Sequence, residues 1–517
     1  MTAFPPSIFN DVIGPVMRGP SSSHVAGAAR ISSLVRQSLP GEIVRVMVDF
    51  DPNGSLAESY HGHGSDIGFV SGLLGMDLTD PNVFQACDLA KEKGMDVQFR
   101  IYEYGADHPN FYRIYAENQQ GYSCRWDAIS VGGGMIEMIA YNDFVVSIVG
   151  DFYELLITLE DLSSVEAIKE LVGNWEYCNT IQKDGQTLLQ FQCSKPVDTS
   201  ITAQISKMSG VKDCVLLNPV LPIHSRANLS VPFLSAEELL KKQDSTRTEV
   251  WQYAVWYESQ RGNISEEEVF QKMNALVDIM ENAVAEGLKG TSYADRILGP
   301  QAHLIAEKKE KNLLIPCNIL NEVIQDITAI METKSSMGVI VAAPTAGSCA
   351  CLPGTLIAMA DAMELGREEL VKGMLAAGLI GVFIAQSSTF AAEVAGCQAE
   401  CGSGSGMAAA GLVQMMHGTL QQVLDAASMA LQNISGLVCD PVANRVEVPC
   451  LGKNIMCGSN AISSANMILA GYDKVIPLDE TIAAIYDIGL KLPLELRCTY
   501  GGLGKTPTSN QIRSRLS

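Results

Sequence analysis

The chain has 517 residues, enough for roughly two to four domains that each bury a core of their own. Its 36 basic and 58 acidic residues give a net charge of −22, which argues against nucleic acid as a partner. Residues 1–6, MTAFPP, lack the basic and then apolar pattern of a targeting signal. We therefore expect a cytoplasmic protein that acts on a small molecule and keeps its cysteines reduced.

Residues 1–142 combine short apolar runs, glycine-rich turns and helical stretches. The run Ile43–Val48 predicts a strand, and Ala26–Gln37 predicts a helix. This alternation is typical of a mixed α/β domain.

Residues 143–224 predict a small module of strands and helices. Strands are expected at 144–149, 153–158 and 188–192, with helices at 163–171 and 201–208. A β-α-β regulatory or packing module is one interpretation, and the ACT type is a possible relative. The other interpretation is an extension of the first domain.

Residues 225–517 are helical in pattern and predict an all-α domain. Ser265 begins a capping-box sequence, and Val269, Met273, Leu276 and Met280 follow along one predicted helix face. The most apolar stretch, residues 374–385, is too short to span a bilayer and predicts a buried helix, so no membrane is expected. The fold class expected for the chain is therefore α+β multidomain.

Three cysteines in the last domain suggest an iron-sulfur cluster. Cys397, Cys439 and Cys450 lie among glycine and proline, and the flanking residues place Cys439 and Cys450 at predicted turns and not in helix interiors. Their spacing does not fit a zinc finger. Three thiolates would leave one iron of a cluster open to a substrate. The alternative is that all three are small apolar residues of a core.

The sequences around these cysteines resemble the iron-sulfur L-serine dehydratases, in a form with the beta and alpha domains fused in one chain. The resemblance covers most of the chain and is weakest in the middle segment. The motifs that carry it, in the order of the family, are GPSSSH at 19–24, GSLA at 54–57, GHGSD at 62–66, SVGGG at 130–134, APTAGSC at 343–349, AEVAGCQ at 392–398 and CDPV at 439–442.

The resemblance implies conversion of L-serine to pyruvate and ammonia at a [4Fe-4S] cluster held by Cys397, Cys439 and Cys450. The open iron would act as a Lewis acid for the loss of hydroxide. No pyridoxal phosphate is expected, because lysines such as Lys334 lack a phosphate-binding loop. A homodimer is the default assembly.

Candidate catalytic and substrate-binding residues come from the N-terminal motifs and from the APTAGSC motif. His24 and His63 are candidate bases, and His63 matches the family motif better than His61 does. Ser21, Ser22 and Ser23 lead into a predicted helix, whose N–H groups favour a carboxylate. Whether these N-terminal motifs complete the active site or bind an effector serine stays open. Residues expected to bind the substrate carboxylate are Thr345, Gly347 and Ser348.

The chain departs from the family at its end, RSRLS, where many relatives carry a cysteine that can occupy the open iron. Either the cluster is more exposed to oxidation, or another thiol serves as the fourth ligand. The candidates are Cys498, Cys457, Cys401 and the pair Cys349 and Cys351. The alternative functions are a related L-cysteine desulfidase and a non-catalytic amino-acid sensor.

Overall fold

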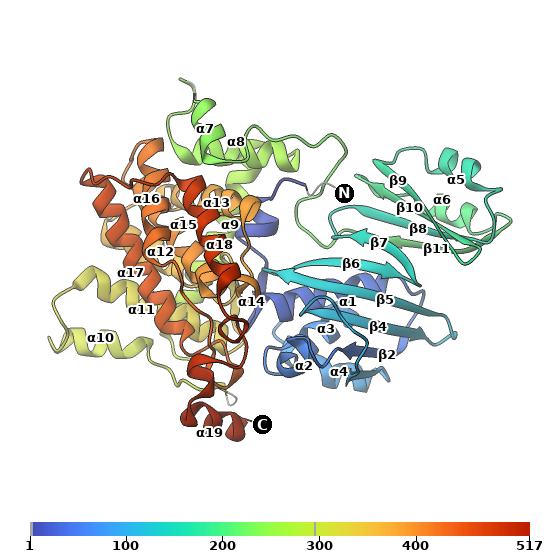
Figure 1. Cartoon of the computed structure of the whole chain (residues 1–517), viewed down its shortest axis with the longest axis horizontal. Coiled ribbons are helices and arrows are strands. Elements are labelled where there is room, and N and C mark those ends of the chain that lie inside the picture. The colour runs from blue at the N-terminus through green and yellow to red at the C-terminus, as the bar shows by residue number, and fades with distance from the viewer. Residues whose placement is uncertain (1–3, 244, 294–295, 517) are drawn as a thin grey trace. The chain divides into compact units, whose positions relative to one another are not determined.

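In a computed structural model, which describes residues 4–243, 245–293 and 296–516, the chain forms two compact units (Figure 1). The helical unit comprises Met1–Ser22 and Ser230–Ser517, and the sheet unit comprises Ser23–Leu229. The predicted α+β class is confirmed. The boundaries expected near residues 142 and 224 stay a prediction. Expectations about residues 1–3 and 517 lie outside the described residues.

The helical unit is almost entirely α-helical. Its strands are β1 (Val16–Arg18) and β12 (Val339–Val341), which pair with each other. Its helices are α7 (Ala236–Lys241), α8 (Val250–Gly262), α9 (Glu266–Leu288), α10 (Ala302–Glu310), α11 (Asn318–Ser335), α12 (Cys351–Ala362), α13 (Arg367–Ser387), α14 (Ala392–Ala395), α15 (Ser403–Met415), α16 (Leu420–Asn433), α17 (Cys450–Leu469), α18 (Leu478–Lys491) and α19 (Pro507–Leu516).

The N-terminal segment packs into this unit although most of the unit follows much later in the chain. Glu258 of α8 accepts hydrogen bonds from the Ser7 hydroxyl (2.5 Å) and the Ile8 amide (2.8 Å). The β1–β12 pairing places Val16 beside Val341. Strand β12 leads directly into the APTAGSC loop, so the first 22 residues support one wall of the candidate site.

Sequence patterns account for the main helices of the unit. Ser265 caps α9 by accepting a hydrogen bond from the Glu268 amide, and Val269, Met273 and Met280 are buried on its inner face. Helix α13 contains the predicted buried stretch 374–385. Although α13 is long and apolar enough to cross a membrane, 78% of the apolar window is buried within the protein. One such helix is weak evidence for a membrane span, because a buried core helix passes the same test.

The sheet unit contains a six-stranded sheet with helices packed against it. The strand order is β3-β2-β4-β5-β6-β7, in which only β2 and β3 are parallel. The helices are α1 (Gly27–Gln37), α2 (Leu56–Ser59), α3 (Ser65–Leu74) and α4 (Ala86–Glu92). The strands are β2 (Ile43–Phe50), β3 (Asp96–Ile101), β4 (Phe111–Asn118), β5 (Ser123–Gly132), β6 (Met135–Tyr141) and β7 (Phe144–Ile148).

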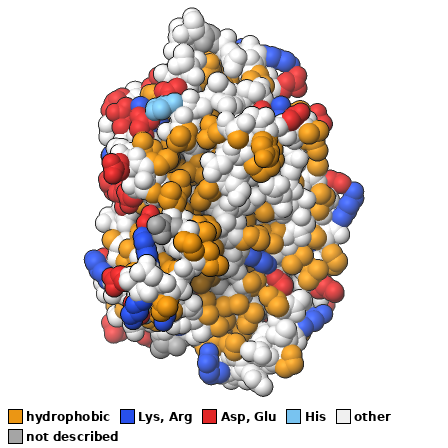
Figure 2. Space-filling view, turned by 90° about the vertical axis from the view of Figure 1, so that its left-hand side faces the viewer, with side chains coloured by type: hydrophobic (Ala, Val, Ile, Leu, Met, Phe, Trp, Pro, Cys, Tyr) orange, Lys and Arg blue, Asp and Glu red, His pale blue; other side chains and the backbone are white. Residues whose placement is uncertain are grey.

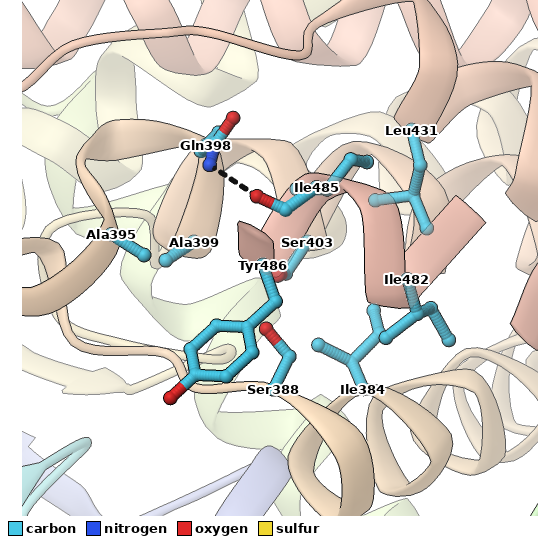
Figure 3. Close-up of a pocket in the computed structure, with 10 residues that line it drawn as sticks. All are labelled: Ile384, Ser388, Ala395, Gln398, Ala399, Ser403, Leu431, Ile482, Ile485 and Tyr486. Atoms are coloured by element: carbon cyan, nitrogen blue, oxygen red, sulfur yellow. Dashed lines mark hydrogen bonds between the residues drawn. The ribbon is translucent and has the colours of Figure 1, made fainter. Parts of the chain in front are cut away.

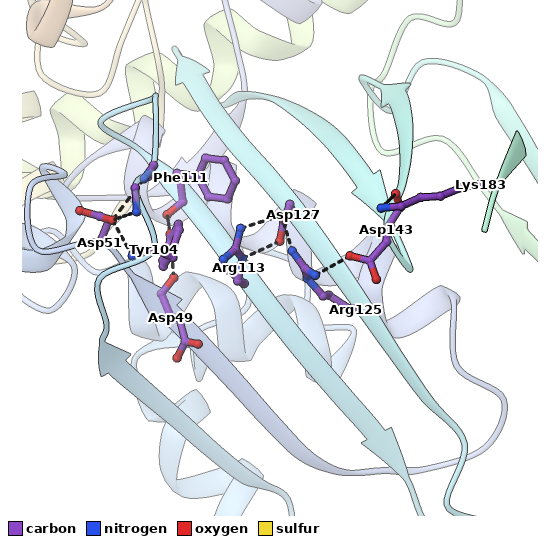
Figure 4. A network of polar contacts seen from close by, with 11 residues as sticks. Asp49, Asp51, Tyr104, Phe111, Arg113, Arg125, Asp127, Asp143 and Lys183 are labelled. Atoms are coloured by element: carbon purple, nitrogen blue, oxygen red, sulfur yellow. Dashed lines mark hydrogen bonds and ion pairs between the residues drawn. The ribbon is translucent and has the colours of Figure 1, made fainter. Parts of the chain in front are cut away.

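A polar network covers part of this sheet and fixes its loops (Figure 4). Asp127 on β5 accepts hydrogen bonds from the guanidinium groups of Arg113 and Arg125, and Arg125 also pairs with Asp143. Asp51, at the end of β2, accepts hydrogen bonds from four backbone amides, of Asn53, Tyr104, Gly105 and Ala106. Each of these carboxylates has its hydrogen-bond donors within the sheet unit, so we interpret the contacts as structural.

A second, four-stranded sheet completes the unit, with strand order β11-β8-β10-β9 and antiparallel neighbours throughout. Helices connect β8 to β9 and β10 to β11, which is the split β-α-β topology of ferredoxin-like domains. The sequence analysis missed β9 and β11. The elements are β8 (Tyr153–Leu159), α5 (Val165–Val172), β9 (Tyr177–Lys183), β10 (Gln186–Cys193), α6 (Thr199–Ile205) and β11 (Val211–Leu217).

Strand β7, which was expected to open the middle module, instead belongs to the six-stranded sheet. Asn142 and Asp143 both have positive φ angles, of 45° and 71°, as a two-residue hairpin turn requires. This turn returns the chain alongside β6, and Tyr141 pairs with Phe144. The second sheet therefore begins at β8.

One buried carboxyl group lies within the second sheet. Glu154 on β8 accepts hydrogen bonds from the side-chain amides of Gln192 (2.8 Å) and Gln190 (3.1 Å). Burial raises the pKa of Glu154 to about 8, against the opposing effect of these hydrogen bonds. The group is therefore mostly protonated in the folded protein at neutral pH.

We expect Glu154→Gln to remove part of the pH dependence of stability. The folded state holds this proton up to a pKa of about 8, whereas an unfolded glutamate loses it near its ordinary value, so the group's contribution to stability falls as pH rises between the two. The limiting slope is about 1.4 kcal/mol per pH unit. Thermal unfolding from pH 5 to 8 should show that the stability of the variant increases relative to that of the parent as pH rises. A difference in stability that does not change with pH would contradict the prediction.

Candidate active site

The three predicted cluster cysteines converge in the helical unit. Cys397 directly precedes the short helix η4 (Gln398–Gly402), Cys439 follows α16 in an extended segment, and Cys450 is the first residue of α17. All three are at most 3% exposed. They come from three separate segments, so only the tertiary fold brings them together.

The thiols are close enough to influence one another's ionisation. A hydrogen bond with Cys401 and burial raise the pKa of Cys397, while contact with Cys498 and burial raise the pKa of Cys439. Burial raises the pKa of Cys450, and charge on Cys439 and Cys397 adds to the effect. Three buried thiols that resist ionisation need a cationic centre if they are to act as thiolates.

Further cysteines pack near these thiols. The sequence predicted them only as candidate fourth ligands. Cys439 is joined to Cys498 through the backbone, because the Cys498 amide donates to the Cys439 carbonyl (2.9 Å). The cysteines packed together in this core, besides Cys397 and Cys439, are Cys351, Cys401, Cys457 and Cys498. Cys349 and Cys450 are also buried but lie outside this group.

The donor set consists of buried thiols. Thiolates are the ligands that iron-sulfur clusters prefer. Among the residues that the structure describes, no group of three His, Cys, Asp or Glu side chains is placed to hold a single metal ion.

A buried ion pair lies beside the thiols. Lys453 of α17 pairs with Asp440 (2.9 Å) and donates to the Val438 carbonyl (2.6 Å). Although burial opposes it, negative charge on Cys397, Asp440 and Cys439 raises the pKa of Lys453. This lysine therefore places a fixed positive charge against the ligand set.

The APTAGSC loop is held by an asparagine that the sequence analysis missed. The side-chain amide of Asn454 donates to the carbonyls of Gly347 and Cys450, both at 2.9 Å, and its oxygen accepts from the Cys351 amide (3.0 Å). Asn454 is completely buried. One side chain thus ties the loop to Cys450 and to the start of α12.

The predicted substrate-binding residues of this loop lie together. Thr345 and Ser348 hydroxyls are 3.1 Å apart and both are buried. Ser22 accepts a hydrogen bond from the Ala346 amide (3.1 Å), so it supports the loop from the N-terminal segment. Ser21 belongs to the same unit.

Glu400 is a second residue that the sequence analysis missed. It lies within η4, and its carboxylate accepts a hydrogen bond from the Thr345 hydroxyl (2.8 Å). Burial, with a contribution from Glu393, raises its pKa to about 7. The detectable signal was a charged residue within the otherwise small and apolar sequence AGCQAECGSGSG.

A small pocket lies behind the Cys397 segment (Figure 3). Its room suits about one water molecule, too little for an amino acid. Gln398 lines it and fixes the segment by donating to the Ile485 carbonyl (2.8 Å) and accepting from the Gly436 amide (2.7 Å). The pocket therefore belongs to the support of the cysteine site.

The predicted histidines lie together in the sheet unit. His24 is buried, its Nε2 lies 3.0 Å from the Ser59 hydroxyl, and its ring meets that of His63 edge-on at 4.6 Å. Burial lowers the pKa of His24 well below its ordinary value, and the charge of the neighbouring His63 lowers this pKa further. His61 is instead largely exposed and pairs with Asp66 (2.5 Å). Ser23 precedes His24 and its carbonyl accepts from the Ser130 hydroxyl.

Comparison with known proteins shows what the helical part of the chain is similar to. The family model of the serine dehydratase alpha chain matches residues 245–503. A probable L-serine dehydratase alpha chain of Bacillus subtilis is 39% identical over 253 residues, which cover 49% of this chain and 84% of that protein.

Two further relatives extend the similarity beyond this region. A probable L-serine dehydratase beta chain of Bacillus subtilis is 34% identical over 212 residues, covering 40% of this chain and 94% of that protein. L-serine dehydratase 1 of Escherichia coli is 26% identical over 496 residues, covering 94% of this chain and 95% of the relative. One chain here thus has counterparts of the alpha and beta chains that are separate in Bacillus subtilis.

Proposed function

Because this chain belongs to the serine dehydratase alpha chain family, we propose that it is an L-serine dehydratase, which converts L-serine to pyruvate and ammonia, and that it carries a [4Fe-4S] cluster. The convergence of Cys397, Cys439 and Cys450 supports the cluster, since three buried thiols from separate segments meet at one place. We assign these three cysteines as its ligands.

When bound, such a cluster supplies a Lewis acid for the loss of the serine hydroxyl. Lys453 offsets the negative charge of the thiolates, and Asn454 holds the APTAGSC loop against them. Thr345, Gly347 and Ser348 bind the substrate. The aminoacrylate product hydrolyses to pyruvate and ammonia without further enzyme chemistry.

His24 and His63 are the proposed source of the base that removes the α-proton. The lowered pKa keeps His24 neutral at neutral pH, so it can accept a proton but is a weak base. His63 lies against it and is the better candidate by sequence motif. Ser21, Ser22 and Ser23 precede this pair and are proposed to bind a carboxylate, either of the substrate or of an effector serine.

The cluster assignment is tested on anaerobically purified protein by absorbance near 400 nm, iron and sulfide content, and pyruvate formed from L-serine. We expect about four irons per chain. Serine substitution at Cys397, Cys439 or Cys450 should abolish both the chromophore and turnover, whereas Cys214→Ser, in the sheet unit, should preserve both. Full iron content in the three variants would overturn the ligand assignment; sulfide released from L-cysteine, without pyruvate from L-serine, would favour a desulfidase.

His63→Ala should lower turnover by about 100-fold or more, as expected when a general base is lost, while the cluster absorbance stays unchanged. His61→Ala is the matched control, because the His61 side chain is largely exposed and its loss should alter turnover by less than about fivefold. The measurement is the rate of pyruvate formation from saturating L-serine. Unchanged turnover of His63→Ala with an intact cluster would remove this histidine from the mechanism.

We also propose that the protein acts in the cytoplasm as a homodimer. Apolar side chains gather on one face of the molecule in Figure 2. In the segment between α10 and α11, Leu313 and Ile315 are 65% and 79% exposed, and Ile319 of α11 is exposed as well. Exposed apolar residues grouped in this way are typical of a contact surface.

Sedimentation should therefore give the mass of a dimer for the parent chain and that of a monomer for a variant carrying both Leu313→Glu and Ile315→Glu. Both substitutions lie in an exposed segment, so the variant should stay folded and unfold in a single cooperative transition on heating. A parent chain that sediments as a monomer at micromolar concentration would contradict the proposal.

A further inference from the structure

The carboxylate of Glu400 lies between the segment that follows Cys397 and the APTAGSC loop. Glu400 belongs to η4, three residues after Cys397, and it accepts a hydrogen bond from the Thr345 hydroxyl of the loop (2.8 Å). The residue itself is only partly buried, whereas Thr345 beside it is 2% exposed. Part of Glu400 therefore remains accessible beside the buried Thr345.

The APTAGSC loop is shaped to leave room for this carboxylate. A Cβ atom at Gly347 would lie 3.0 and 3.1 Å from the two carboxylate oxygens, which is closer than side chains normally pack. Glycine at position 347 therefore allows the loop to wrap around Glu400. The Thr345 hydroxyl, which donates to Oε1, fixes its orientation.

The negative charge of Glu400 has little compensation within the protein. In the part of the chain that the structure describes, the Thr345 hydroxyl is its hydrogen-bond donor and no lysine or arginine forms an ion pair with it. Lys453 is engaged by Asp440, and Lys334 donates to the Val446 carbonyl. A desolvated carboxylate is costly unless a cation meets it, and its raised pKa reflects that cost.

A zwitterionic amino acid presents the cation that this position lacks. The substrate carboxylate would be repelled by Glu400, but its α-ammonium would be attracted and could donate a charge-assisted hydrogen bond. Lys334 is completely buried and donates to the Val446 carbonyl, so the substrate carboxylate is left to the APTAGSC loop, where the Ser348 hydroxyl and backbone amides are the available donors.

We propose that Glu400 binds the α-ammonium group of the substrate and so selects amino acids over hydroxy acids. This proposal rests on the proposed function. The ligand pair that isolates this interaction is L-alanine and L-lactate, which differ only in carrying an ammonium or a hydroxyl on the α-carbon. Neither has a leaving group, so both can be measured on the cluster-containing enzyme without turnover.

The test compares the parent enzyme with Glu400→Gln, which keeps an acceptor for Thr345 but removes the charge. Dissociation constants are measured by ligand-observed NMR and by competition against L-serine turnover. L-Alanine should bind roughly 10- to 100-fold more weakly to the variant, the loss expected for a hydrogen bond to a charged group. L-Lactate should bind equally well or better. Glu393→Gln is the matched control and should preserve the preference for alanine.

Several results would overturn the inference. An equal loss for both ligands would mean that Glu400 only supports the loop, and an unchanged preference would mean that it does not meet the ammonium. A changed cluster spectrum in Glu400→Gln without ligand would make Glu400 an iron ligand instead. Failure of the proposed function has a different signature, namely no pyruvate from L-serine with the parent enzyme, whatever the ligand preference.

Discussion

The site depends on one constraint, that thiols and charged groups removed from water must compensate one another. Cys397, Cys439 and Cys450 are buried and resist ionisation as free thiols. A bound cationic cluster would reverse that resistance, and Lys453 already lies beside the thiols to share their charge. The surrounding polar groups then serve to position this arrangement. Asn454, with four hydrogen bonds to the segments that carry or face the cysteines, does so most directly.

Close packing of backbone makes this burial possible. Helix α15, which follows η4, contains glycines at 404, 406 and 411, and a Cβ at Gly411 would lie within 3.0 Å of atoms in α12 and α13. Small residues let neighbouring helices approach each other, so the loops between them are held from several sides. The cysteine positions therefore do not depend on the bound group alone for their arrangement.

The sequence predicted individual helices and strands better than it predicted which strands pair and which distant side chains meet. Periodicity located α9 and β8, and motif recognition selected the three cysteines that the fold then brings together. Strand β7 pairs with β6 and not with the strands that follow it, because Asn142 and Asp143 form a hairpin turn that composition does not distinguish from a linker. Asn454 and Glu400 were missed because their roles arise from contacts with residues far away in sequence, which no local pattern encodes.

The sheet unit is inserted into the helical unit, since the first 22 residues belong with everything after residue 229. Ribosomes release the chain from its N-terminus, so residues 23–229 can fold as soon as they emerge, whereas β1 must wait for β12. Throughout that interval the N-terminal segment has no native partner. The helical unit, and with it the cysteine site, can therefore be completed only after residues far along the chain have been synthesised.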